Sequence, residues 1–92
     1  MMTAKAFERI SKALGDPYRL KMIEAIQKGS ECMPCTSILE MFGLAQSTVS
    51  HHLKQLVDAE LLIATKDGRN AKYVINKEVF AEYITFLNRF RN

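Results

Sequence analysis

Two stretches between residues 36 and 59 space their apolar residues as helices do, and Gly43 lies between them. The first stretch is short and has an apolar face of Ile38, Leu39 and Phe42. The second has a single apolar stripe, formed by Val49, Leu53, Leu56 and Val57. A short helix, a turn with glycine and a helix with one buried stripe are typical of a helix-turn-helix.

Small polar residues mark where these two helices should begin. Thr36 or Ser37 can cap the first helix, and Glu40 is in capping-box range of Ser37. Ser47 can cap the second helix, which we expect to run to about Ala59.

After Glu60 the pattern changes to that of a β-hairpin. Leu61–Thr65 and Ala71–Asn76 look like strands, and the segment between them, Lys66–Asn70, contains Asp-Gly. Asp-Gly between two β-prone runs is a strong hairpin signal. A hairpin directly after a helix-turn-helix is a wing, so the sequence predicts a winged helix.

Two further helices should precede this unit. Thr3–Leu14 is amphipathic, and Gly15 can end it in the left-handed conformation. Asp16 followed by Pro17 is a strong start signal for a second helix, which should close at Gly29. The expected apolar stripe of this second helix is Leu20, Ile23, Ala25 and Ile26, with Met22 beside it.

A last helix is expected from Lys77 to Phe90. Its broad apolar face consists of Val79, Phe80, Tyr83, Ile84, Leu87 and Phe90. One small domain cannot easily bury so much apolar surface, which favours a homodimer. We therefore predict one domain over residues 1–92, mainly α with a small β-hairpin wing (α+β), in the order helix, helix, helix, helix, hairpin, helix.

Composition and charge narrow the class of protein. The chain is 48% hydrophobic and 25% charged, as soluble globular domains are. Its apolar runs are far shorter than the roughly 20 residues that span a bilayer, and residues 1–9 carry charges where a signal peptide would be apolar. We therefore expect a cytoplasmic protein without a membrane partner, in which two cysteines are not a disulfide framework. A formal net charge of +3 permits nucleic-acid binding without demanding it.

The second helix of the helix-turn-helix has a face suited to a DNA groove, because no acid occurs from Gln46 to Leu56. Glutamine can bond adenine in two places, serine and histidine can reach bases or phosphates, and lysine can neutralise a phosphate. We expect a DNA interface formed by Gln46, Ser47, Thr48, Ser50, His51, Lys54 and Gln55. Alternatively, this side of the helix is an ordinary polar surface that contacts only solvent.

The hairpin contains three basic residues, Lys66, Arg69 and Lys72, and one acidic residue, Asp67. We expect these three basic residues to contact phosphates or the edge of a minor groove. Alternatively, they only keep an edge strand soluble.

His51 and His52 are adjacent, so their side chains diverge by about 100° on a helix and cannot chelate one metal together. We expect His51 to face the groove and His52 to pack near the helix-turn-helix core.

Residues 45–56, Ala-Gln-Ser-Thr-Val-Ser-His-His-Leu-Lys-Gln-Leu, are similar to the recognition helix of the arsenic-repressor and metal-sensor family (ArsR–SmtB). Residues 14–20 resemble that family's entry into its second helix, and residues 58–62 and 67–69 resemble its strand entry and wing. The similarity covers nearly the whole chain. It implies a homodimeric repressor that binds an inverted-repeat operator in double-stranded DNA, with the first and last helices at the dimer interface and an inducer that weakens binding.

Cys32 and Cys35 lie just before the third helix. Family members that sense metals there usually carry Cys-x-Cys, and those thiol positions fall on Pro34 and Thr36 in this chain. The family's set of His and acidic ligands on the last helix is missing, since that segment has no His. A two-residue gap lets both sulfurs bind one As(III) species or organoarsenical, or Zn or Cd if Glu31 or another residue adds ligands. No cofactor should be required for folding.

Other roles for the cysteine pair stay open. The thiols could cycle to a disulfide and sense oxidants or sulfur species, or they could be structural. Cys-x-Pro-Cys also occurs in thioredoxin-like oxidoreductases, but these need a preceding strand and a βαβ unit. We expect no enzyme, because the chain has no phosphate loop, plausible triad or carboxylate pair. A winged helix that binds protein instead of DNA is a further alternative.

Overall fold

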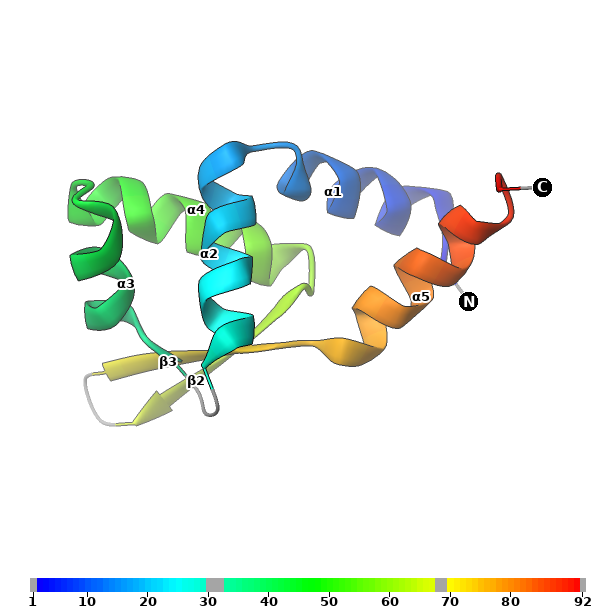
Figure 1. The fold of residues 1–92 in the computed structure, drawn as a ribbon. Helices are drawn as coiled ribbons and strands as arrows, with labels where there is room; N and C mark the ends of the chain where they lie inside the picture. Colours follow the sequence, from blue (N-terminus) through cyan, green and yellow to red (C-terminus); the bar gives the residue numbers. More distant parts are fainter. Residues whose placement is uncertain (1, 30–32, 68–69, 92) are drawn as a thin grey trace.

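A computed structural model describes residues 2–29, 33–67 and 70–91 (Figure 1). The elements follow the predicted order, and the mainly α fold with a hairpin is confirmed. They are α1 (Ala4–Leu14), α2 (Pro17–Lys28), β1 (Met33–Pro34), α3 (Cys35–Phe42), α4 (Gln46–Asp58), β2 (Leu62–Asp67), β3 (Asn70–Ile75) and α5 (Lys77–Asn88).

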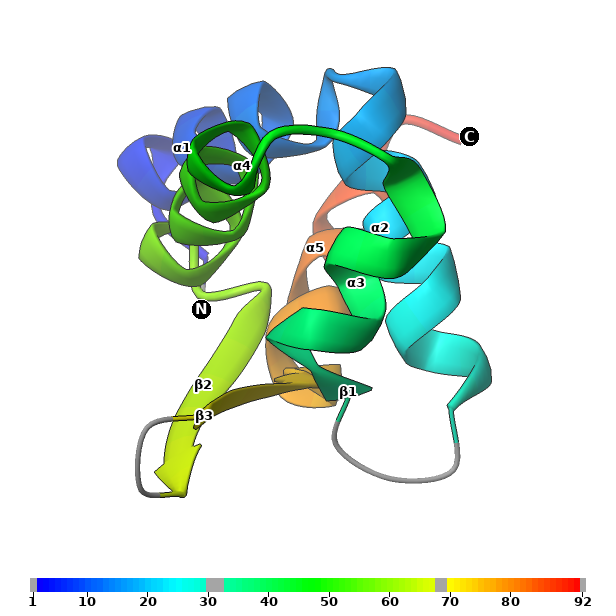
Figure 2. The same ribbon diagram turned by 90° about the vertical axis from the view of Figure 1, so that its left-hand side faces the viewer.

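The molecule is elongated, with extents of 43 × 22 × 22 Å. Helix α3 lies at one end and α5 at the other, with α2 between them (Figure 1). The hairpin of β2 and β3 extends beyond the helices, below α4 (Figure 2). This arrangement leaves α4 and the hairpin at one end and the last helix at the opposite end.

The sheet contains a strand that the sequence did not predict. Its order is β1-β3-β2, and both pairings are antiparallel. Two residues of β1 pair with β3, Met33 opposite Tyr73 and Pro34 opposite Lys72. A two-residue strand shows no alternation of apolar and polar residues, so its sequence carries no strand signal. It ties the segment between α2 and α3 to the wing.

The core draws on every helix before the wing and on the start of β2. Its fully buried large side chains are Ile10, Met22, Ile38, Leu53, Leu56, Leu61, Leu62 and Val49. The predicted stripe of α4 is confirmed. In α2 the prediction was partly wrong, because Met22 is fully buried whereas Leu20 is 46% exposed. The buried face of α2 is therefore rotated from the expected stripe toward Met22 and Ile26.

Side-chain caps start α1, α2 and α5, and of these the sequence predicted the cap of α2 by Asp16. Thr3 Oγ1 accepts a hydrogen bond from the N–H of Ala6 at 3.1 Å. Asp16 Oδ1 accepts from the N–H groups of Tyr18 at 2.9 Å and Arg19 at 3.2 Å, with proline at the first helical position. These bonds satisfy N–H groups that have no partner inside the helix.

Three other cap predictions were wrong. Helix α3 begins at Cys35, so Thr36 and Ser37 lie inside its first turn and do not precede it. Helix α4 begins at Gln46 after Ala45, which offers no side-chain cap, so Ser47 is its second residue. Gly15 has a φ of −79°, because the chain passes directly into the extended cap of α2 without a left-handed turn.

Left-handed backbone occurs instead on both sides of α4. Gly43 has a φ of 61° in the turn after α3. Glu60 has a φ of 64°, with its N–H bonded to the carbonyl of Val57 and the N–H of Leu61 bonded to that of Leu56. This is the Schellman pattern that usually takes glycine. It turns the chain from α4 into β2.

Some boundaries differ from the prediction by one to three residues. Strand β2 extends to Asp67, so Lys66 belongs to a strand and not to the turn, and β3 begins at Asn70. Helix α5 ends at Asn88, although the N–H of Phe90 still bonds to the carbonyl of Leu87 at 3.0 Å.

Candidate nucleic-acid interface

The outer face of α4 carries the predicted DNA contacts. Val49, Leu53 and Leu56 are buried together with His52, and the residues on the opposite side of the helix point outward. The exposed set is Gln46, Ser47, Thr48, Ser50, His51 and Lys54, and Gln55 is half-buried. The structure therefore gathers all seven predicted residues on α4, with six of them open to solvent.

Lys54 has an acidic partner on the same helix. Its Nζ lies 2.8 Å from Oδ2 of Asp58, and both side chains are more than half exposed. Exposed pairs one turn apart contribute only about 0.3–0.5 kcal/mol. A phosphate could therefore take the place of Asp58 at little cost.

His52 is buried, as expected, and its environment is specific. It is 9% exposed, and its Nδ1 accepts a hydrogen bond from Nε of Arg19 on α2 at 3.1 Å. The ring of Tyr18 stacks on His52 with 6.0 Å between centroids. The sequence did not indicate these partners, because they lie 33 and 34 residues earlier in the chain.

Asp16 is the acidic residue next to Arg19 and His52, where α2 meets α4. Burial alone would raise the pKa of its carboxyl, but the N–H groups of Arg19 and Tyr18 and the neighbouring His52 and Arg19 side chains hold that pKa below its usual value. The carboxylate is therefore favoured where it caps α2.

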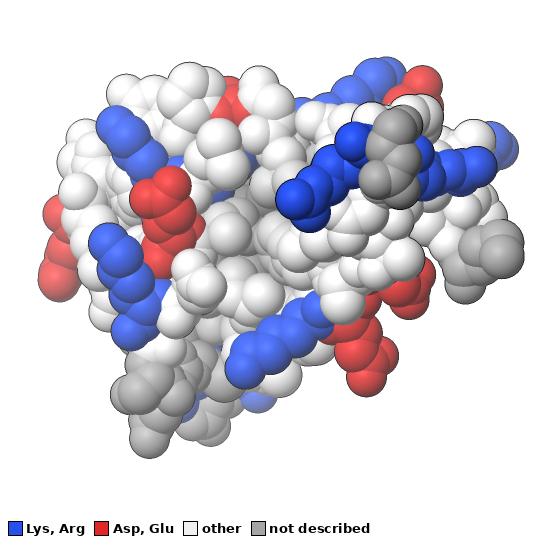
Figure 3. All heavy atoms as spheres, turned by 45° about the vertical axis from the view of Figure 1, so that its right-hand side comes forward, with Lys and Arg blue, Asp and Glu red and all other residues white. Residues whose placement is uncertain are grey.

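The wing places its basic residues on two strands. Lys66 is exposed on β2, and Lys72 is half-buried on β3, opposite Thr65 and Pro34. Arg69 lies outside the described residues, so its predicted role stays a prediction. On the face drawn in Figure 3, basic and acidic side chains are scattered over a largely uncharged surface, and several basic ones lie together at the upper right.

Helix α5 has two faces with different surroundings. One packs on α1, where Phe7 contacts the rings of Tyr83 and Phe86, and Tyr83 Oη lies 2.9 Å from Ser11 Oγ. The other is open, with Ile84 at 55%, Leu87 at 42% and Phe90 at 70% exposure. The expected apolar face is therefore only partly covered by the chain's own residues.

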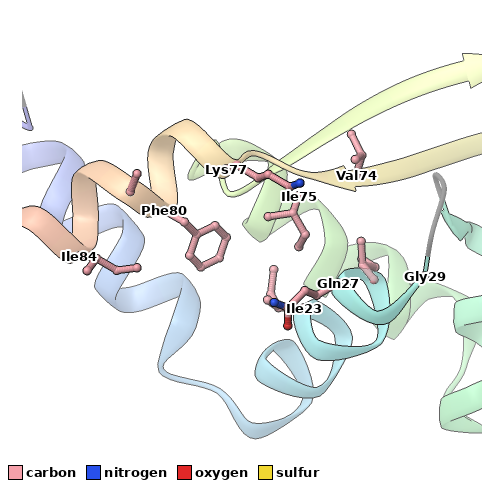
Figure 4. A pocket seen from close by; sticks show the side chains of 10 residues that line it. Ile23, Gln27, Gly29, Val74, Ile75, Lys77, Phe80 and Ile84 are labelled. Carbon is pink, nitrogen blue, oxygen red and sulfur yellow. The ribbon is translucent and has the colours of Figure 1, made fainter.

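A pocket adjoins the open face of α5, and the sequence did not predict it. It has a volume of about 810 Å³ and lies between the end of α2, strand β3 and the start of α5 (Figure 4). Most lining residues are apolar, among them Ile23, Ile75, Phe80 and Ile84. Gln27 and Lys77 supply polar groups.

Comparison with known proteins decides the family. A family model described as a helix-turn-helix domain matches residues 14–63. The arsenical resistance operon repressor of Staphylococcus xylosus is 40% identical over 83 residues, which are 90% of this chain and 77% of that protein. The repressor of the same name from Staphylococcus aureus is 37% identical over 87 residues, 95% of this chain and 82% of that protein. The chain belongs to the ArsR family of transcriptional regulators.

Solved structures agree with this family in fold. The structure of an ArsR family transcriptional regulator matches this chain over 98% of this chain's length and 91% of its own length. The TM-score is 0.88 and the sequence identity is 22%. The structure of a homodimeric winged helix-turn-helix DNA-binding domain from Mycobacterium bovis matches 95% of this chain and 80% of that chain. The TM-score is 0.75 and the sequence identity is 22%. The ArsR family consists of DNA-binding regulators and not of enzymes.

The alternative of a thioredoxin-like oxidoreductase is therefore wrong. The described strands pair only in antiparallel fashion, so they form no βαβ unit around Cys35.

The candidate thiol site of this ArsR-family chain is only partly within the described residues. Cys35 is the first residue of α3, and Cys32 lies outside the described segments. No group of three or more His, Cys, Asp and Glu side chains that could hold a metal ion occurs among the residues that the structure describes. Within the same residues no helix is long and apolar enough to cross a membrane.

Proposed function

We propose that this chain is a cytoplasmic, homodimeric repressor of transcription that leaves its operator when Cys32 and Cys35 bind a thiophilic metalloid or metal. One observation carries the DNA-binding part of this proposal. The second helix of a helix-turn-helix presents an exposed face with hydroxyl, amide, imidazole and amine groups and no acid from Gln46 to Leu56. Major-groove recognition needs these groups.

Each group on α4 has a distinct task in this proposal. Gln46 and Ser50 reach base edges, where an amide can bond adenine in two places. His51 reaches a base edge or a phosphate. Lys54 gives up its ion pair with Asp58 and binds a DNA phosphate instead. Lys66 on the wing binds a phosphate beside the same groove.

A second copy of the chain covers the open face of α5. Apolar side chains exposed as a group mark an interface, and Ile84, Leu87 and Phe90 form such a group. Two acids in the first half of α5, Glu78 and Glu82, outnumber the one base there, Lys77. Two arginines, Arg89 and Arg91, follow the end of the helix. An antiparallel pair of α5 helices brings acids and arginines together, whereas a parallel pair would oppose arginine to arginine.

The pocket supports the same arrangement. If Ile84 lies at the two-fold axis, residues 87 and 90 of the second copy stand level with residues 81 and 78 of the first, at about 1.5 Å of rise per residue. The pocket is lined along α5 by Lys77, Phe80, Ala81 and Ile84, which cover the same span. Leu87 and Phe90 of each copy would therefore fill the pocket of the other.

Two-fold symmetry then sets the operator. The recognition helices of the two copies enter successive major grooves, so half-sites lie about 10 bp apart or a multiple of it, as an inverted repeat.

The inducer site is proposed from chemistry and family membership. Two thiolates complete the coordination of a trivalent arsenical that keeps one organic group on arsenic, whereas arsenite, Zn or Cd needs a further ligand such as Glu31. Cys35 opens α3, and α3 supports α4 through the buried side chain of Ile38. A ligand held by both sulfurs would therefore act on the helix that positions α4. Two relatives similar to this chain are named arsenical resistance operon repressors.

A selection followed by a titration tests the proposal. Selection from random double-stranded DNA should yield an inverted repeat, and fluorescence anisotropy then measures binding while arsenite, methylarsenite, zinc, cadmium, peroxide or polysulfide is added in turn. Release by an arsenical or metal in the presence of a phosphine reductant supports the proposed inducer. Release only by peroxide or polysulfide, reversed by the reductant, would replace it with a disulfide switch. Failure to select any DNA would contradict the function itself.

A further inference from the structure

Arg19, at the start of α2, joins three helices. Its Nε donates to Nδ1 of His52 on α4 at 3.1 Å. One terminal nitrogen of the same guanidinium lies 3.4 Å from the carbonyl oxygens of Lys12 and Ala13, in the last turn of α1. Carbonyls in the last turn of a helix have no partner within it. The planar side chain of Arg19 therefore links α4 to α1 and α2.

The bond to Arg19 requires a neutral imidazole. Nδ1 of His52 accepts, so the ring proton is on Nε2. No buried side-chain nitrogen or oxygen among the described residues lacks a partner, and Nε2 has no protein partner, so Nε2 reaches solvent. A second proton can enter the ring only at Nδ1, where it would displace Arg19.

The other ionisable groups around His52 do not replace this bond. Asp16 and Tyr18 on α2 lie beside it, and His51 follows on its own helix with 6.1 Å between ring centroids. Asp16 opposes the positive charge, but its Oδ1 already accepts two backbone N–H groups. The remaining ionisable side chains that the structure describes on α1, α2, α3 and β2, the elements packed on α4, are exposed and have no hydrogen bond to His52.

We propose that Arg19 is a positioning residue for α4 and that it acts only while His52 is neutral, which makes sequence-specific DNA binding weaken in acid. The proposal rests on the proposed DNA binding by α4. Helix α1 also packs on α5 through Ser11 and Tyr83. Arg19 therefore sets how α4 is held relative to the side of the molecule that faces the second copy. Specific binding needs both α4 helices in register with the grooves, whereas non-specific binding needs mainly charge.

Three variants separate this role from a general loss of structure. Arg19→Ala removes the donor, and Arg19→Lys keeps one. His52→Asn keeps an acceptor oxygen close to the Nδ1 position and does not titrate. Affinity for the selected inverted repeat and for unrelated DNA is measured at about pH 7.5 and about pH 5.5, across the range in which histidine titrates. His51 is present in both the wild type and His52→Asn, so the difference between these two proteins reports on His52.

The wild type should lose about tenfold more specific affinity on acidification than His52→Asn, as expected for one hydrogen bond to a charged group. Arg19→Ala should show that loss already at neutral pH, and Arg19→Lys should recover part of it. Equal losses in the wild type and His52→Asn would overturn the inference, and this comparison decides it if Arg19→Ala does not fold.

The tautomer of His52 provides a measurement that does not involve DNA. Nitrogen NMR at neutral pH should show Nδ1 without a proton and Nε2 with one, and the opposite tautomer would also overturn the inference. If the wild type prefers no DNA sequence, the proposed function fails, and this spectrum then decides the inference about the pair by itself.

Discussion

His51 and His52 are neighbours with ring centroids 6.1 Å apart, but His51 is exposed whereas His52 is only 9% exposed. His52 turns into the junction with α2 and accepts a hydrogen bond from Arg19. Successive residues of a helix diverge by about 100°, so adjacent identical residues can have separate roles. We therefore propose that His51 contacts DNA and that His52 holds α4.

Replacing His51 should therefore weaken DNA recognition without affecting the fold. His51→Ala, and separately Ser50→Ala, should lower affinity for the operator by about 1–3 kcal/mol, because Ser50→Ala removes a proposed contact to a base edge and His51→Ala one to a base edge or a phosphate. Anisotropy titrations measure this effect, and circular dichroism should show an unchanged unfolding transition. Glu24→Ala, an exposed change on α2, is the control. Unchanged operator affinity in His51→Ala would mean that α4 does not dock by this face.

Wing substitutions should act on all DNA alike. Lys66→Ala and Arg69→Ala each remove a charge that we place on a phosphate, so specific and non-specific affinity should fall by similar factors. The slope of log affinity against log salt should become shallower by about 0.9 for each lost phosphate contact. Titrations at several salt concentrations give the slope. A loss confined to the operator sequence would assign these residues to base edges instead.

Single cysteine substitutions should uncouple DNA binding from its inducer. One sulfur cannot bridge to the other, so Cys32→Ser and Cys35→Ser should each bind the operator as the wild type does and fail to release it. A coupling of about 1–3 kcal/mol corresponds to a 5- to 150-fold release in the wild type. Release from either variant at the wild-type inducer concentration would make the pair structural and place the sensor elsewhere.

A charge at the proposed two-fold axis should separate the two copies. Ile84→Arg brings two arginines together where two isoleucines would pack, so sedimentation equilibrium should show a monomer at micromolar concentration. Met41→Arg is the matched control, because Met41 is equally exposed, at 57%, but lies on α3 at the other end of the molecule. A wild-type dimer that survives Ile84→Arg would contradict the antiparallel pairing of α5.

Asp16 should make stability depend on acid. Asp16→Ala removes the cap of α2 and should cost about 1 kcal/mol of unfolding free energy, whereas Asp16→Asn keeps an acceptor and should cost little. The folded-state pKa of Asp16 is below its ordinary value of 3.8. Its contribution is therefore fully present above that value and is lost as pH falls through the lowered one. Urea unfolding between neutral pH and acid should show this dependence in the wild type and not in Asp16→Asn.

The features predicted from the sequence are those with a local signal. The stripe of Val49, Leu53 and Leu56 faces the core because its period matches a helix, and the same period turns Ser50 and His51 outward. Asp-Gly located the hairpin.

The features that were missed depend on distant parts of the chain. Strand β1 exists because β3 offers it an edge, and Arg19 meets His52 across 33 residues. The pocket beside Phe80 needs α2, β3 and α5 together. The caps assigned to Ser37 and Ser47 failed because neighbouring residues, Cys35 and Gln46, already begin those helices.

Recognition of DNA by α4 should appear as a preference for one DNA sequence. The affinity of the wild type for the selected inverted repeat is compared with its affinity for the same DNA with both half-sites scrambled, at one fixed salt concentration. The wild type should prefer the intact repeat by at least about 10³-fold. Equal affinity for the two DNAs would contradict the assignment of α4 as the recognition helix.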